Sequence, residues 1–287
     1  MTTASDTAPV AAPVAARDAA SEPGHSVLEV VHVEHVMGTA VSLHLRARTE
    51  PPRASDSAAH EPEEIAGAIE LACAELHRAD SLFSTWKAES PMSRIRCGRL
   101  RVETAPAEIG EVLDLCADVR ELTSGWFDPW SMPGGVDPTG LVKGWAVERA
   151  LGALRGCGVL AACVNAGGDL AVFGVPARGD RWRFGVRHPW RRDALACVVA
   201  VGGSLATSGT YERGPHLFDP HARRLSARAA SASVVGPSLA IADGLATALC
   251  VGGDQVLDRI ARIPGYEGYL VRTDGSEAWT EGMPFVE

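Results

Sequence analysis

The chain has 287 residues, 46% of them hydrophobic and 22% charged, and its formal net charge at pH 7 is −9. The length suffices for one large domain or two small ones, and the composition is ordinary for a soluble globular protein. The acidic charge and the lack of Lys/Arg-rich runs among aromatic residues argue against a nucleic-acid-binding protein. No apolar stretch reaches the roughly 18 residues of a membrane span.

The N-terminal residues 1–25 are rich in Ala and Pro and lack the basic and apolar regions of a secretory leader. We therefore expect a disordered tail over 1–25, one ordered domain over 26–287 and a cytoplasmic protein. The seven cysteines are scattered and include no CxxC pair. This pattern favours free thiols in a reducing compartment and gives no zinc-site spacing among the cysteines.

The first ordered segments are predicted from the spacing of apolar residues. Alternating apolar and polar residues over 26–47 predict two strands, or one bent strand, with Gly38 at the bend. Apolar residues at helical spacing predict helices over 63–84 and 105–125. A polar loop is expected over 82–95, between these helices.

The C-terminal half is predicted to combine strands with two helices. A Gly- and Pro-rich loop over 126–140 precedes a helix over 141–158, and a second helix ends a strand–turn–helix unit over 231–253. Further strands are expected over 159–174, 181–189, 194–209 and 265–280. Because strands and helices do not alternate strictly, we predict an α+β fold with mixed, largely antiparallel sheets and packed helices.

The predicted helix within 231–253 is apolar but carries Asp243 and Thr247, four residues apart. Positions i and i+4 share one face of a helix, with Cβ atoms roughly 5–6 Å apart. The carboxylate and the hydroxyl could therefore hold a hard cation such as Mg²⁺. The structural alternative is that Asp243 caps the helix and that Thr247 bonds to a carbonyl of its own helix.

A turn between two predicted strands contains Asn165, Gly167, Gly168 and Asp169. Its glycines would let backbone amides approach a ligand closely, although the same residues are also typical of an ordinary β-turn.

A predicted helix start combines Asp137, just before the helix, with Lys143 in its first turn. A helix N-terminus with a lysine suits a phosphate, but the GxxxxGK[ST] pattern of a P-loop is absent. The alternative is a capped helix with a solvated lysine.

Three further residues are candidates for ligand contacts. Ser208 lies in a Ser/Thr/Gly-rich segment that leads to His216, and His216 could act as a general base. A lone histidine is more often structural. Trp86, in the predicted loop over 82–95, could stack on a planar ring or could anchor the loop.

These motifs occur in the order found in a known family. The segments "MGT", "FSTW", "FDP", "GLVKGWAVERA", "VNAGGDL", "ATSGTYER" and "ADGLATAL" together resemble the FAD:protein FMN transferases, the ApbE-like family. The resemblance runs from about Met37 to Cys250. It implies one compact ApbE-like domain built from two intertwined halves, with FAD bound between them.

The resemblance also implies an activity and its cofactors. Members bind FAD and Mg²⁺, transfer the FMN moiety of FAD to a Thr or Ser hydroxyl of a target flavoprotein, and release AMP. Some members instead hydrolyse FAD to FMN and AMP. The alternatives are therefore a Mg²⁺-dependent FAD pyrophosphatase and a non-catalytic FAD-binding protein.

Roles for individual residues follow from the same resemblance. Asp243 and Thr247 match the metal-binding side chains, and Val142 matches the residue that supplies a main-chain carbonyl to the metal. Either His216 or Asp169 is expected to accept the proton of the attacking hydroxyl. The residues expected to contact FAD are Met37, Trp86, Asp137, Lys143, Asn165, Gly167, Gly168, Asp169, Ser208 and His216.

Overall fold

The computed structural model describes residues 27–48, 62–155, 159–177, 181–210 and 217–286. The predicted tail over 1–25 and the candidate base His216 lie outside these residues.

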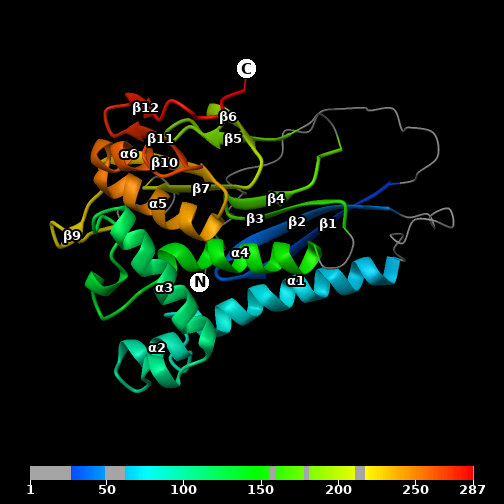
Figure 1. Ribbon diagram of the computed structural model, residues 1–287, viewed down its shortest axis with the longest axis horizontal. Helices are drawn as coiled ribbons and strands as arrows, with labels where there is room; N and C mark the ends of the chain where they lie inside the picture. Colours follow the sequence, from blue (N-terminus) through cyan, green and yellow to red (C-terminus); the bar gives the residue numbers. More distant parts are fainter. Residues whose placement is uncertain (1–26, 49–61, 156–158, 178–180, 211–216, 287) are drawn as a thin grey trace, which may run out of the picture.

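An eight-stranded antiparallel sheet forms the centre of the fold, in the order β1-β2-β3-β4-β7-β10-β11-β12 (Figure 1). The first four strands come from the N-terminal part of the chain and the last four from the C-terminal part. The two sets meet where β4 pairs with β7, so one continuous sheet joins them. The strands are β1 (Val27–Val36), β2 (Thr39–Arg48), β3 (Ala161–Ala166), β4 (Asp169–Phe173), β7 (Ser204–Gly209), β10 (Ala229–Gly236), β11 (Glu267–Arg272) and β12 (Glu277–Trp279).

Helices cover one face of this sheet (Figure 1). Helix α4 packs against α1, α5, β3 and β4, and α5 also packs against β7 and β10. Helix α3 contacts α4 and α5 from outside. The helices are α1 (Pro62–Phe83), α2 (Pro91–Arg96), α3 (Ala107–Leu122), α4 (Thr139–Arg155), α5 (Leu239–Gly252) and α6 (Asp254–Ile260), with short 3₁₀ turns η1 (Val102–Thr104) and η2 (Pro129–Ser131).

A two-stranded sheet of β5 (Trp182–Arg187) and β6 (Leu195–Val201) covers the other face, and β8 (Phe218–Asp219) pairs with β9 (Arg224–Leu225) in a separate hairpin. Each face of the central sheet has its own apolar core. The alternation along β4 shows why: Leu170 and Val172 join the core under β5 and β6, whereas Ala171 joins the core under the helices.

Most of the predicted elements are confirmed, and the misses are short or lie at element ends. Helix α2 lies inside the segment predicted as a loop over 82–95, where Ser90 caps it by accepting a hydrogen bond from the Ser93 N–H at 3.0 Å. Helix α4 begins at Thr139, within the predicted loop over 126–140. Helix α6 was not predicted. One or two turns of helix are too short for apolar periodicity to stand out.

Two tight hairpins lie side by side at one end of the sheet. Met37 and Gly38 join β1 to β2 with φ angles of +54° and +72°, and Gly167 and Gly168 join β3 to β4 with +63° and +105°. Positive φ at both central positions is what two-residue hairpin turns favour. The positive φ of Gly167 favours glycine, and a Cβ there would lie 2.9 Å from the Thr39 hydroxyl oxygen, where the two turns touch.

In the described part of the chain, no helix has both the length and the apolar character needed to cross a membrane.

Candidate functional site

Helix α5 presents Asp243 and Thr247 toward α4 and β7. Ser238 caps the helix, so Asp243 is not its cap. Asp243 is 4% exposed and accepts a hydrogen bond from the Gly144 N–H of α4 at 3.0 Å. The Thr247 hydroxyl oxygen lies 3.2 Å from that of Ser208 on β7. Asp243 therefore contacts α4 and Thr247 contacts β7, so a site at these side chains would include residues of all three elements.

Glycines allow the start of α4 to run close along α5. A Cβ on Gly144 would lie 2.5 Å from the carbonyl oxygen of Leu239, and a Cβ on Gly140 would lie 3.5 Å from the Thr247 hydroxyl oxygen. Val142 lies between these contacts and is buried. The role of Gly144 was not predicted, although a glycine inside a helical pattern is a signal of close packing.

Lys143 reaches from α4 to Asp169, the first residue of β4, and the two side chains form an ion pair. Asp169 is 1% exposed, and its other oxygen accepts a hydrogen bond from the Thr207 N–H at 2.8 Å. About a third of the Lys143 side chain remains accessible, at 33% exposure. The buried Asp169 carboxylate thus holds the partly accessible Lys143 ammonium group beside Asp243 and Thr247.

The electrostatics of the site favour an added cation. Burial and the neighbouring Asp169 anion raise the pKa of Asp243 above its ordinary 3.8, whereas Lys143 and the Gly144 N–H act in the opposite direction. A bound positive charge would favour the ionised form of this carboxylate. The side-chain donors are oxygens, and oxygen is the ligand type that hard cations such as Mg²⁺ take.

The β3–β4 turn positions Asp169, and Asn165 stabilises this turn. The Asn165 side-chain oxygen accepts a hydrogen bond from the Gly168 N–H at 2.9 Å, and Asn165 is only 3% exposed. Alternation along β3 places Asn165 on the sheet face opposite to Ala166, which packs under the helices. Asn165 therefore stabilises the turn, and its contact with FAD stays a prediction. The adjacent β1–β2 hairpin brings Met37 to the same end of the sheet.

Asp137 fixes the beginning of α4. One of its oxygens accepts hydrogen bonds from the N–H of Thr139 at 3.1 Å and from its hydroxyl at 2.7 Å. The other lies 2.8 Å from the Arg96 guanidinium. Asp137 therefore positions the turn that carries Val142 and Lys143.

The remaining predicted residues are less connected to this centre. The Trp86 side chain follows α1 and is 96% exposed, so it is accessible for stacking. His216 lies outside the described residues, between Ser208 on β7 and Phe218 on β8.

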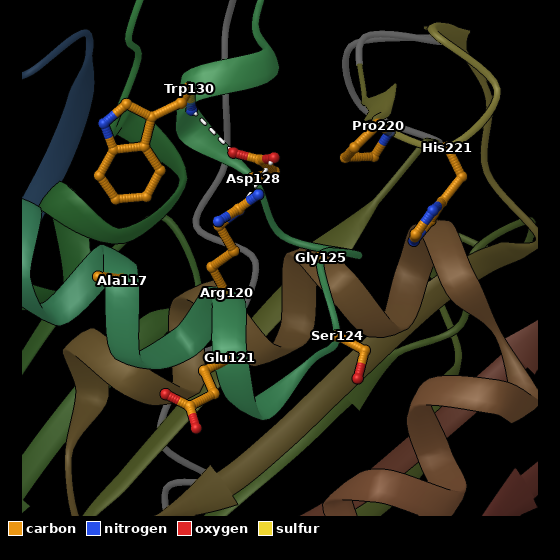
Figure 2. A pocket seen from close by; sticks show the side chains of 9 residues that line it. All are labelled: Ala117, Arg120, Glu121, Ser124, Gly125, Asp128, Trp130, Pro220 and His221. Atoms are coloured by element: carbon orange, nitrogen blue, oxygen red, sulfur yellow. Dashed lines mark hydrogen bonds and ion pairs between the residues drawn. The ribbon is translucent and has the colours of Figure 1, made fainter.

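An open pocket lies beside the loop that follows α3 (Figure 2). Arg120 and Asp128, on one side of it, form an ion pair at 3.0 Å, and the ring of His221, on the other side, packs edge-on against Trp126 with ring centres 4.4 Å apart. The pocket is lined by Ala117, Arg120, Glu121, Ser124, Gly125, Asp128, Trp130, Pro220 and His221. This set contains none of the residues predicted from the sequence. The same loop links the pocket to the site, because a Cβ on Gly140 would lie 3.1 Å from the Phe127 ring.

Comparison with known proteins identifies the family. The sequence model of the ApbE family matches residues 37–135 and 130–270, which together cover most of the chain. The chain belongs to the ApbE family. A protein from Rhodobacter capsulatus named FAD:protein FMN transferase is 36% identical over 142 residues, which are 46% of this chain and 27% of that protein. One of the same name from Salmonella typhimurium is 28% identical over 151 residues, 49% of this chain and 43% of that protein.

These alignments span less than half the length of either relative. The solved structure of the flavin transferase ApbE from Vibrio cholerae matches this ApbE family member with a TM-score of 0.73. The match covers 89% of this chain and 98% of that structure at 19% identity. It confirms the predicted fold class.

Proposed function

We propose that this ApbE family member transfers the FMN moiety of FAD to a Thr or Ser hydroxyl of a target flavoprotein and releases AMP. The observation that carries the proposal is the meeting of two pairs of side chains where α4 and α5 touch. Asp243 and Thr247 provide oxygen ligands, and Lys143, held by Asp169, provides a partly accessible cation. The names of the relatives from Rhodobacter capsulatus and Salmonella typhimurium support the same activity.

The donor set fits a Mg²⁺ ion. The Asp243 carboxylate, the Thr247 hydroxyl and the Val142 carbonyl would hold it, because all three are hard oxygen donors. When bound, the ion would offset the negative charge that develops on the pyrophosphate of FAD.

The residues of the chain itself would supply orientation and charge. Lys143, whose side chain is partly accessible, would attract the pyrophosphate. Asp169, fixed by the Thr207 N–H, keeps Lys143 directed into the site. Most of the acceleration would come from positioning and electrostatics, as in other phosphoryl transfers.

The proposed reaction exchanges one bond at the FMN-side phosphorus of FAD. The acceptor hydroxyl oxygen forms a new bond to this phosphorus, and the bond from the same phosphorus to the AMP phosphate oxygen breaks. The hydroxyl proton passes to a base, for which His216 and Asp169 are the candidates. AMP leaves with the electron pair of the broken bond.

The experiment combines the purified chain, FAD, Mg²⁺ and an acceptor domain with a Thr in a flavinylation segment. AMP is measured by chromatography and the acceptor by intact mass. AMP together with an FMN-sized mass increase on the acceptor supports the transferase. AMP with free FMN and no adduct would support the pyrophosphatase instead, and intact bound FAD without AMP would support a binding protein.

A matched pair of variants connects the activity to the site. Asp243→Asn should lower AMP release on the order of 100-fold, whereas Asp118→Asn, at an exposed carboxylate of α3, should leave it unchanged. Equal activity of the two variants would contradict the assignment of the metal site to α5.

A further inference from the structure

Helix α1 packs against the edge strand β1, and four side chains of residue types that can bind a metal come from these two elements, which Figure 1 shows. His32 and Glu34 come from β1, and Cys73 and His77 come from α1. The ligand atoms of His32, Glu34 and Cys73 all lie within 4.8 Å of one another. The Glu34 carboxylate lies 3.4 Å from His32 Nε2 through one oxygen and 3.2 Å from His77 Nε2 through the other.

The local periodicity of each element directs these side chains to one point. Residues i and i+2 of a strand share one face, which pairs His32 with Glu34. Residues i and i+4 of a helix also share one face, which pairs Cys73 with His77. All four are accessible: the side chains of His32, Glu34 and His77 are 37%, 27% and 55% exposed, and Cys73 is half-buried.

We propose that His32, Glu34, Cys73 and His77 form a binding site for a Zn²⁺ ion that joins α1 to β1. Two imidazoles, one thiolate and one carboxylate are all common zinc ligands, and four of them complete a tetrahedral site. Zinc bonds of about 2.0–2.3 Å place neighbouring donor atoms about 3.3–3.8 Å apart. The ligand atoms of His32, Glu34 and Cys73 lie within 4.8 Å of one another, so small side-chain movements would bring them to these spacings. His77 Nε2 lies 3.2 Å from a Glu34 oxygen, and rotation of its exposed side chain would bring it to the fourth position.

The chemistry of this cluster separates it from the oxygen site on α5. Nitrogen and sulfur ligands select zinc-like ions over Mg²⁺. Without a cation the thiol is protonated, because burial and the nearby Glu34 carboxylate raise the pKa of Cys73 to about 11. Binding of Zn²⁺ would displace this proton, since the thiolate is the form that coordinates metal.

The test uses the full chain, stripped of metal with a chelator and titrated with Co²⁺. One equivalent should produce a thiolate-to-cobalt charge-transfer band, and one equivalent of Zn²⁺ should remove it, whereas millimolar Mg²⁺ should not. Cys73→Ser should lose the band, and His77→Gln should weaken Co²⁺ binding at least about tenfold. His77→Gln changes an exposed side chain, so it tests the site even if Cys73→Ser disturbs folding.

Cys97→Ser provides the matched control. Cys97 is also a free thiol, but it is exposed and follows α2, away from the cluster. Its replacement should leave both the band and the Co²⁺ affinity unchanged. The proposal is overturned if no band forms, if Cys73→Ser keeps it, or if Cys97→Ser removes it. Because none of these measurements uses AMP release, the result is independent of the proposed transferase activity.

Discussion

Gly144→Ala tests the close contact between α4 and α5 on which the proposed site depends. A Cβ at this position would lie 2.5 Å from the Leu239 carbonyl oxygen and 3.0 Å from the Ala240 Cα. Both are backbone atoms of α5, so side-chain rotation cannot relieve the overlap and the two helices must move apart. The movement would also weaken the hydrogen bond from the Gly144 N–H to Asp243.

The size of the effect follows from three contributions. An extra methyl group in a close-packed interior costs about 1–3 kcal/mol, and backbone neighbours place Gly144 at the upper end. The weaker bond to Asp243 adds on the order of 1 kcal/mol, and the better helix propensity of alanine offsets about 1 kcal/mol. We therefore expect the free energy of unfolding to fall by about 3 kcal/mol. At roughly 2–4 °C per kcal/mol, Tm should fall by about 6–12 °C.

Gly152→Ala is the matched control, because Gly152 lies on an exposed face of the same helix and a Cβ there meets nothing within 4 Å. Alanine at this position should raise the free energy of unfolding by about 0.5–1 kcal/mol. Urea unfolding followed by circular dichroism measures both variants, and AMP release should fall only in Gly144→Ala. If the two variants are equally stable, the close contact between α4 and α5 does not exist.

Three other substitutions address the charges around this contact. Asp243→Asn should lower AMP release on the order of 100-fold without loss of stability, because a neutral amide removes the repulsion by Asp169; a parallel loss of stability in urea would point to misfolding instead. Lys143→Met leaves Asp169 buried without its ion-pair partner and should destabilise the fold by about 3 kcal/mol, so a change in Tm of less than a degree would contradict the pairing. Burial raises the pKa of Glu148 above its ordinary 4.5, so its contribution to stability is fully present below pH 4.5 and is lost as pH rises through the folded-state pKa. Urea midpoints measured over a series of pH values should lose this part of their pH dependence in Glu148→Gln. If the variant and the unchanged chain show the same pH dependence, Glu148 does not contribute as described.

The elements that were predicted well are those whose signal is local. The apolar spacing of α1, the alternation of β1 and β2, and the glycine turn at 167–168 all depend on residues within a few positions of one another. The prediction for Asp243 and Thr247 also rests on a local signal, because their four-residue spacing places them on one face of a helix. The start of α4 and the short helix α2 depend on caps instead: Asp137 holds Thr139, and a serine hydroxyl caps α2.

By itself, the sequence determined the class of fold and the residue types available for the site, because period and composition are properties of short segments. Only the tertiary structure decided which partners these residues meet. Asp243 bonds to Gly144, 99 positions away in the chain, and Asp169 pairs with Lys143 from another element. Similarly, "HVE" on β1 and "CAELH" on α1 form no recognisable metal-binding motif in the sequence. Their potential ligands come together only because α1 packs against β1. Such contacts arise from packing between distant segments, which leaves no local pattern in the chain.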